Sequence, residues 1–181
     1  MAFSTEQWLK IVRWDPTDPA FESVDLISRY ITPALLQVPD THSHTLIERG
    51  DYGNYAHVLV HRALNVDEIR ESRHHRPVTF DGISVNLSLT VPIAAMAFTT
   101  ARVASGSFGS GVVDLDDVIE PSRGNHPLAD IVLDVFANTP YEFVSRAFLS
   151  EPLPAGITPF EYCLGSEPWD RVFHGLFANS D

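Results

Sequence analysis

The sequence is poor in cysteine, in long apolar runs and in leader-like features. Its single cysteine, Cys163, excludes an intramolecular disulfide, so the chain needs no oxidising compartment. The most apolar stretch, 91–104, is too short to cross a bilayer and is interrupted by Arg102. The first residues have neither the basic start nor the apolar run of a secretion signal. We therefore expect a cytoplasmic protein with no membrane partner.

Positive charge is also scarce. Only 12 Lys and Arg stand against 24 Asp and Glu, which gives a formal net charge of -12, and Lys10 is the only lysine. Such a field repels nucleic-acid phosphates and attracts basic partners or metal cations. We expect no nucleic-acid partner, and a basic or cationic protein as the binding partner.

Short catalytic motifs are missing as well. The sequence contains no Gly-x-Ser-x-Gly elbow, no phosphate-binding Gly-Lys-Ser/Thr and no dinucleotide-binding glycine spacing. His57 and His61 are four residues apart, but Val58 stands where a zincin metalloprotease has its glutamate. Whether the chain is an enzyme stays open at this point, because many enzymes carry no short motif.

Helix signals are concentrated towards the two ends of the chain. Ser4 and Gln7 form a capping box, which predicts a helix through Val12. Asp18-Pro19 predicts the start of a second helix, whose apolar residues keep helical spacing until Pro33.

The last third of the chain predicts three more helices. Two near-identical starts occur, Thr139-Pro140-Tyr141-Glu142 and Thr158-Pro159-Phe160-Glu161. A final helix is expected to begin near 166–168 and to place one apolar stripe on one face: Trp169, Val172, Phe173, Leu176 and Phe177. We expect this stripe to be core. The alternative is that it faces a partner or a second copy, which leaves a homo-oligomer open.

The middle of the chain indicates strands. The alternating apolar residues of 83–89 follow Val78-Thr79-Phe80 and the turn-forming Asp81-Gly82, a pattern that predicts a β-hairpin. Segments 44–49 and 55–63 form a second hairpin across 50–53, or else 55–63 is a helix.

Segment 92–104 is open between a helix and a strand, because it is rich in alanine but also contains β-branched and aromatic residues. The expected fold is a single α+β domain, 1–181, with N- and C-terminal helices packed on a central antiparallel β element. A mostly α fold is the alternative.

The histidines are the one group with a chemical pattern. His42, His44 and Glu48 give His-x-His-x3-Glu, and residues two apart on a strand face the same way. This spacing is similar to the first metal motif of cupins, over seven residues. The resemblance implies a mononuclear Fe, Mn or Ni site with one more distant histidine. The second cupin motif, Pro-x-Gly-x2-His, is missing.

The additional ligand would come from His57, His61 or a histidine further along the chain. The candidate metal ligands are His42, His44, Glu48, His57 and His61. No cofactor is otherwise expected.

Taken together, charge and missing motifs predict a small acidic module that docks a basic partner, such as a toxin-neutralising immunity protein or an accessory subunit. The alternative is a small enzyme with a histidine-lined metal or acid–base pocket.

Overall fold

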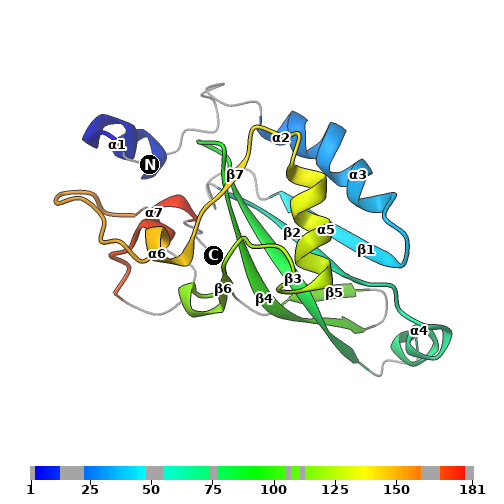
Figure 1. Cartoon of the computed structure of the whole chain (residues 1–181). Helices are drawn as coiled ribbons and strands as arrows, with labels where there is room; N and C mark the ends of the chain where they lie inside the picture. Colours follow the sequence, from blue (N-terminus) through cyan, green and yellow to red (C-terminus); the bar gives the residue numbers. More distant parts are fainter. Residues whose placement is uncertain are drawn as a thin grey trace.

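A twisted sheet forms the centre of the protein. A computed structural model describes residues 3–12, 23–47, 55–73, 77–104, 107–110, 113–159 and 168–177. The sheet has seven strands, and five of them are antiparallel neighbours in chain order (Figure 1): β1 (Thr41–Ile47), β2 (Tyr55–Arg62), β3 (Val78–Ser88), β4 (Ile93–Ala104) and β5 (Ser107–Ser110). Two short strands pair with β4, β6 (Val118–Ile119) antiparallel and β7 (Glu142–Phe143) parallel. The predicted α+β class is therefore confirmed.

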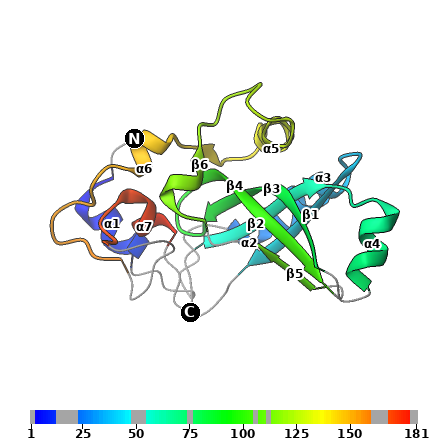
Figure 2. The same ribbon diagram turned by 90° about the horizontal axis from the view of Figure 1, so that it is seen from below.

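Helices lie on one face of the sheet and at both of its ends. One face is covered by α2 (Ser23–Leu26), the π-helix η1 (Ile27–Ile31), α3 (Thr32–Leu36) and α5 (Pro127–Phe136). Figure 2 shows α4 (Val66–Arg73) at one end of the sheet and, at the other, α1 (Thr5–Val12), α6 (Arg146–Leu149) and α7 (Val172–Leu176). Within the described ranges, no helix has the length and apolar character needed to cross a membrane.

The strand register divides the side chains of the sheet into two faces, because directly opposite residues point to the same side. The helix-covered face is apolar and packs against α2 to α3 and α5: Val58, Val60, Ile83, Val85, Leu87, Ala94 and Met96. The opposite face carries the four histidines of β1 and β2, and we call it the histidine face.

Two apolar clusters lie at the ends of the histidine face. Near β2's start, Tyr55 packs in a cluster with Trp8 of α1 and Phe173 of α7. Towards the other end, Leu59 packs with Phe80 and Val103. Polar side chains occupy the strip between these clusters.

The strand predictions for the middle of the chain are partly right. β1 and β2 form the antiparallel pair that 44–63 predicted, and 93–104 is a strand rather than a helix. The predicted hairpin turn at Asp81-Gly82 is wrong, since 78–88 is one continuous strand. Gly82 instead serves close packing: an added Cβ would lie 3.0 Å from Leu59 Cδ1 and 3.0 Å from the Val60 carbonyl oxygen.

The first predicted helices are present. Ser4 and Gln7 make both capping-box hydrogen bonds. The start predicted at Asp18-Pro19 lies outside the described residues, and from 23 onwards the second helix continues past Pro33 to Leu36. Pro33 does not end it, because a new α-helical segment starts at Thr32 after the π-helix and places the proline in its first turn, where no N–H is required.

The predicted helix at 139–142 is wrong. Thr139 Oγ1 donates to the Phe136 carbonyl and so caps the end of α5. Tyr141 is buried and its hydroxyl donates to the Ser88 carbonyl at 3.1 Å, while Glu142 and Phe143 pair with β4. Strand pairing and a buried aromatic side chain therefore outweigh the local helix signal.

Two further helices were predicted in the C-terminal third. Part of the helix start predicted at 158–161, and part of the start predicted near 166–168, fall in residues 160–167, which lie outside the described residues. α7 begins at Val172, later than predicted, and the residues 168–170 are not helical. Its stripe is nonetheless buried in the single chain, as predicted for core: Val172, Phe173, Leu176 and Phe177, with Trp169 half-buried.

The contact between α1 and α7 depends on the absence of a side chain at Gly175. A Cβ there would lie 2.9 Å from Leu153 Cδ2 and 3.0 Å from Trp8 Cζ3. We expect Gly175→Ala to lower the free energy of unfolding by about 1–2 kcal/mol, since overpacking outweighs the gain in helix propensity. Denaturant unfolding measures this loss. Adding Leu153→Val should restore part of it, and an unchanged or higher stability of Gly175→Ala would contradict this packing.

Candidate functional site

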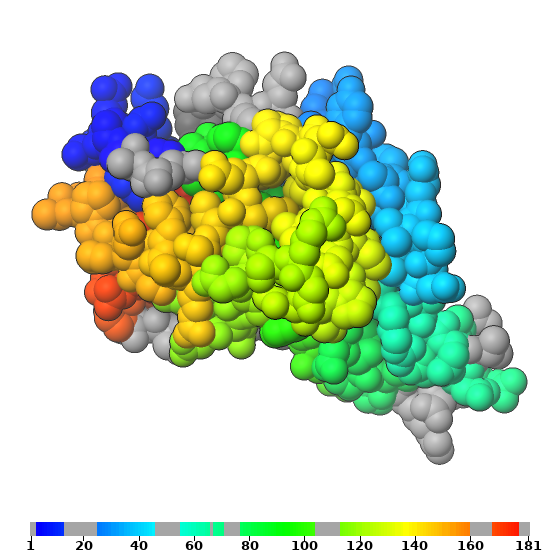
Figure 3. All heavy atoms as spheres, in the orientation of Figure 1, coloured from blue at the N-terminus to red at the C-terminus, as the bar shows by residue number. Residues whose placement is uncertain are grey.

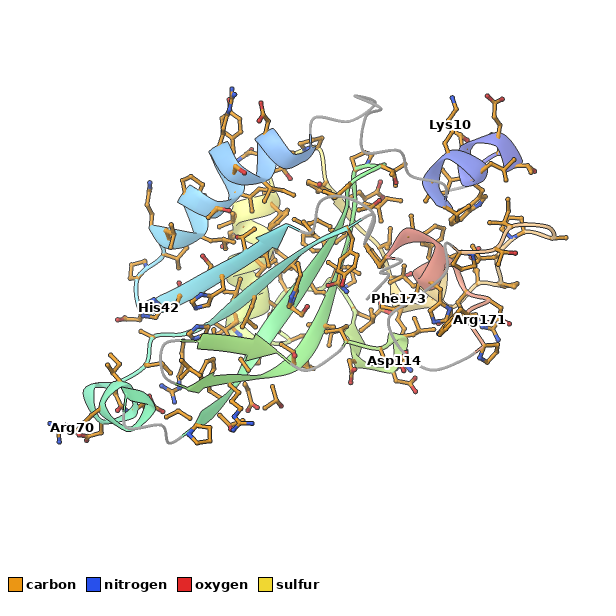
Figure 4. All side chains as sticks on the ribbon, turned by 180° about the vertical axis from the view of Figure 1, so that it is seen from behind. Lys10, His42, Arg70, Asp114, Arg171 and Phe173 are labelled. Atoms are coloured by element: carbon orange, nitrogen blue, oxygen red, sulfur yellow. The ribbon has the colours of Figure 1, made fainter. Side chains whose placement is uncertain are left out.

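The histidines of β1 and β2 are brought together by the strand register. His42 lies directly opposite His61, and His44 lies opposite Leu59, one diagonal step from His61. Figure 4 views the histidine face, with α5 behind the sheet and His42 labelled at the sheet's edge. His42 is exposed, His44 half-buried and His61 completely buried.

His44 and His61 are joined through their ring nitrogens. Their Nε2 atoms are 3.1 Å apart, the ring centroids 5.2 Å apart and the ring planes within 5°. Because the nitrogens are much closer than the centroids, the rings meet edge to edge rather than stacking. His61 Nδ1 lies 2.6 Å from the Arg62 carbonyl oxygen, to which it donates its proton. In a neutral His61, Nε2 is then the acceptor and His44 Nε2 the donor.

The surroundings of this pair keep it uncharged near neutral pH. Burial lowers the pKa of His44, and the neighbouring His42 lowers it further. Burial also lowers the pKa of His61 to about 4, against the opposing effect of its hydrogen bond to Arg62. Both imidazoles therefore offer nitrogen lone pairs rather than positive charge.

His57 lies apart from the other three histidines. It is on the same face as His61 but four residues along β2, about 13 Å at the usual rise of a strand. It stands opposite Asn86 of β3, and its buried Nε2 has no hydrogen-bond partner among the described residues. Burial lowers the pKa of His57 to about 4.

Of the five predicted metal ligands, the structure thus places three in one cluster, His42, His44 and His61, and puts His57 elsewhere. Glu48 lies outside the described residues. Among the residues that are described, no three His, Cys, Asp or Glu side chains converge on one metal position. The cluster is therefore a pair of joined imidazoles with a third ring 5.6 Å from His61, measured between ring centroids.

The polar residues of β3 on this face were not among the predicted site residues. Ser84, Asn86 and Ser88 are buried, and Ser84 Oγ donates to Asn86 Oδ1 at 3.3 Å. The available signal was the strict alternation of 83–89, which was interpreted through its apolar members only. The intervening polar residues mark the opposite face, where they extend the polar strip from the histidines towards the centre of the sheet.

A second candidate surface is acidic. Residues 113–151 contain eight carboxylates and two arginines, so this stretch carries -6, half of the chain's formal charge. Figure 3 shows the stretch, yellow-green to orange, spread over the middle of one face of the molecule. We call it the acidic segment.

Cations neutralise only part of these acids. Both arginines of the acidic segment are already paired, Arg123 with Asp134 at 2.5 Å and Arg146 with Asp116. Across the described side chains, seven cations form ion pairs and Arg102 is the exception. Six exposed acids, four of them in the acidic segment, stay outside these ion pairs: Asp40, Asp81, Asp117, Glu120, Glu142 and Glu151.

Comparisons with protein-family models, with curated proteins and with solved structures found no match to this chain. The site must therefore be interpreted from its own chemistry.

Proposed function

We propose that the protein is a small acidic binding module that docks a cationic protein surface through its acidic segment. The observation that carries this proposal is the excess of exposed carboxylates over cations in 113–151, where the two arginines are already paired. Unpaired exposed charges of one sign steer an oppositely charged partner and favour its correct orientation. An immunity protein or an accessory subunit would act in this way.

Glu142 and Glu151 are the best residues for testing the docking surface. Both are exposed, neither is in an ion pair of the described residues, and neither side chain accepts a hydrogen bond there. Asp117 and Glu120 are less suitable because their carboxylates accept backbone N–H groups of Asp114 and Arg146. Replacing Glu142 and Glu151 therefore changes charge with little effect on the fold.

We expect the double variant Glu142→Lys with Glu151→Lys to bind a synthetic Arg-Ser repeat peptide about tenfold more weakly than the unaltered chain. Fluorescence anisotropy of a labelled peptide measures this loss. Binding to the unaltered chain should also weaken as salt rises, because screening acts on exposed charges. Binding that is equally strong in low and high salt would refute the proposal.

The matched control is Glu6→Lys with Asp81→Lys, which changes the net charge by the same amount outside the acidic segment. Both side chains are exposed. The control should weaken binding much less, because the peptide contacts the acidic segment. Equal losses in the two double variants would show that only net charge matters and would refute a specific docking surface.

A second candidate function, a small enzyme with a histidine-lined metal or acid–base site, is supported by the hydrogen-bonded pair of His44 and His61. Nδ1 of His61 donates to the Arg62 carbonyl, whereas the histidine of a catalytic triad donates this proton to a carboxylate. Metal analysis of the purified chain separates the two functions. Stoichiometric Fe, Zn, Mn or Ni supports the enzyme, and metal-free protein supports the binding module.

A further inference from the structure

We propose that His44 and His61 bind one divalent transition-metal ion, of the zinc and nickel class, through their Nε2 atoms, with the exposed ring of His42 next to the pair. Imidazole nitrogen suits these ions, whereas Mg²⁺ and Ca²⁺ prefer oxygen ligands. The proposal is independent of docking by the acidic segment. It deepens the second candidate function by selecting two ligands, one from each of two neighbouring strands.

The orientation of His61 is the first supporting observation. Its Nδ1 donates to the Arg62 carbonyl at 2.6 Å, which fixes the ring and directs the lone pair of Nε2 towards His44. Metal-binding histidines are held in this way, with the second ring nitrogen donating to a carbonyl or carboxylate. The same main-chain contact that makes His61 an acceptor for His44 therefore prepares it as a metal ligand.

The separation of the two nitrogens is the second observation. Two imidazole nitrogens on one tetrahedral zinc ion lie about 3.3 Å apart at Zn–N distances of about 2.0–2.1 Å. The Nε2 atoms of His44 and His61 are 3.1 Å apart, so their spacing already matches that of two zinc ligands to within a few tenths of an ångström. Binding also requires the two rings to turn so that both Nε2 lone pairs point at an ion to one side of the line between the nitrogens. Nε2 of His44 then gives up its proton and Nδ1 of the same ring gains one by exchange with solvent, so that His44 binds the ion as a neutral imidazole.

Access and charge also favour an ion at this position. His44 is half-buried and His42 is exposed, so an ion with bound water can enter from the β1 side. The ring of His42 is 5.6 Å from that of His61, measured between centroids, and stands two residues from His44 on the same face. The formal charge of -12 attracts cations.

The test is a calorimetric titration of the full chain with Zn²⁺ at neutral pH, after treatment with a chelator. Excess Mg²⁺ is present to occupy surface carboxylates. We expect one Zn²⁺ per chain, and we expect His44→Ala to weaken binding by more than about tenfold, the range seen when even an outer-shell partner of a metal ligand is lost. His57→Leu is the matched control, because His57 is a half-buried histidine of the same face that lies outside the pair, and the variant should bind Zn²⁺ unchanged.

A second measurement does not depend on how a variant folds. In the unaltered chain, ring-nitrogen NMR should show the Nε2 signals of His44 and His61 shifting on addition of Zn²⁺, while those of His57 stay in place. No Zn²⁺ binding in excess Mg²⁺, or binding that survives His44→Ala, would overturn the proposal. Stoichiometric iron or manganese that remains in the purified His44→Ala chain would also overturn this ligand pair, yet leave the enzyme hypothesis standing.

Discussion

Phe173→Ala is expected to cost the protein about 3–5 kcal/mol of unfolding free energy, the typical loss for truncating a buried phenylalanine. Phe173 is completely buried, and its ring contacts Phe177 edge-on at 5.4 Å between centroids. It lies in the cluster that joins α1 and α7 to the sheet (Figure 4). Since total stability is typically about 5–15 kcal/mol, the melting temperature should fall sharply in a thermal unfolding experiment.

Phe98→Ala is the matched control for this prediction. Phe98 is the same residue type but 47 % exposed, and its ring contacts His126 edge-on at 5.5 Å. Its truncation should cost much less, because less apolar surface returns to water. If Phe173→Ala left the monomer as stable as Phe98→Ala does and instead weakened self-association, the stripe of α7 would be an interface and not core.

The second large effect is a loss of stability in mild acid that depends on His57. Burial lowers the pKa of His57 from 6.5 to about 4 in the folded chain, so the unfolded chain binds a proton that the folded chain does not. The contribution of the neutral His57 to the free energy of unfolding is complete above about pH 6.5, falls as the pH drops towards 4 and is lost below that. The difference in pKa corresponds to roughly 3 kcal/mol as an upper limit.

Denaturant unfolding at a series of pH values measures this effect. The unaltered chain should lose stability between pH 6.5 and 4 more steeply than His57→Leu, which has no group to protonate there. The leucine also avoids burying the Nε2 atom, for which the described part of the chain provides no hydrogen-bond partner. Parallel curves for the two proteins would show that His57 does not titrate in this way.

Local signals in the sequence were sufficient where a short segment makes its own contacts. The capping box of Ser4 and Gln7 forms within one helical turn, and the apolar spacing around Phe173 is buried as predicted. The alternation in 83–89 correctly indicated a strand. Such features depend on residues a few positions apart, so their pattern is visible without the fold.

Only the tertiary structure decided the conformation of segments that contact residues distant in the sequence. Gly82 has the composition of a turn, yet the neighbouring strand takes the space its side chain would occupy. Thr139-Pro140-Tyr141-Glu142 has the composition of a helix start, yet pairing with β4 and the hydrogen bond from Tyr141 to Ser88 make it extended.

The arrangement of the histidines was likewise predicted in part by the sequence and decided in part by the tertiary structure. The sequence by itself determined that His42 and His44 share one side of a strand, because the side-chain period of a strand is two. It left open whether His57, His61 or a histidine further along the chain joins them. The register of β1 against β2 selected His61, since it places His61 beside His44 and His57 beyond reach. Strand register depends on the connection between the strands and on which side chains of the whole sheet become buried, so the spacing of the histidines alone does not fix it.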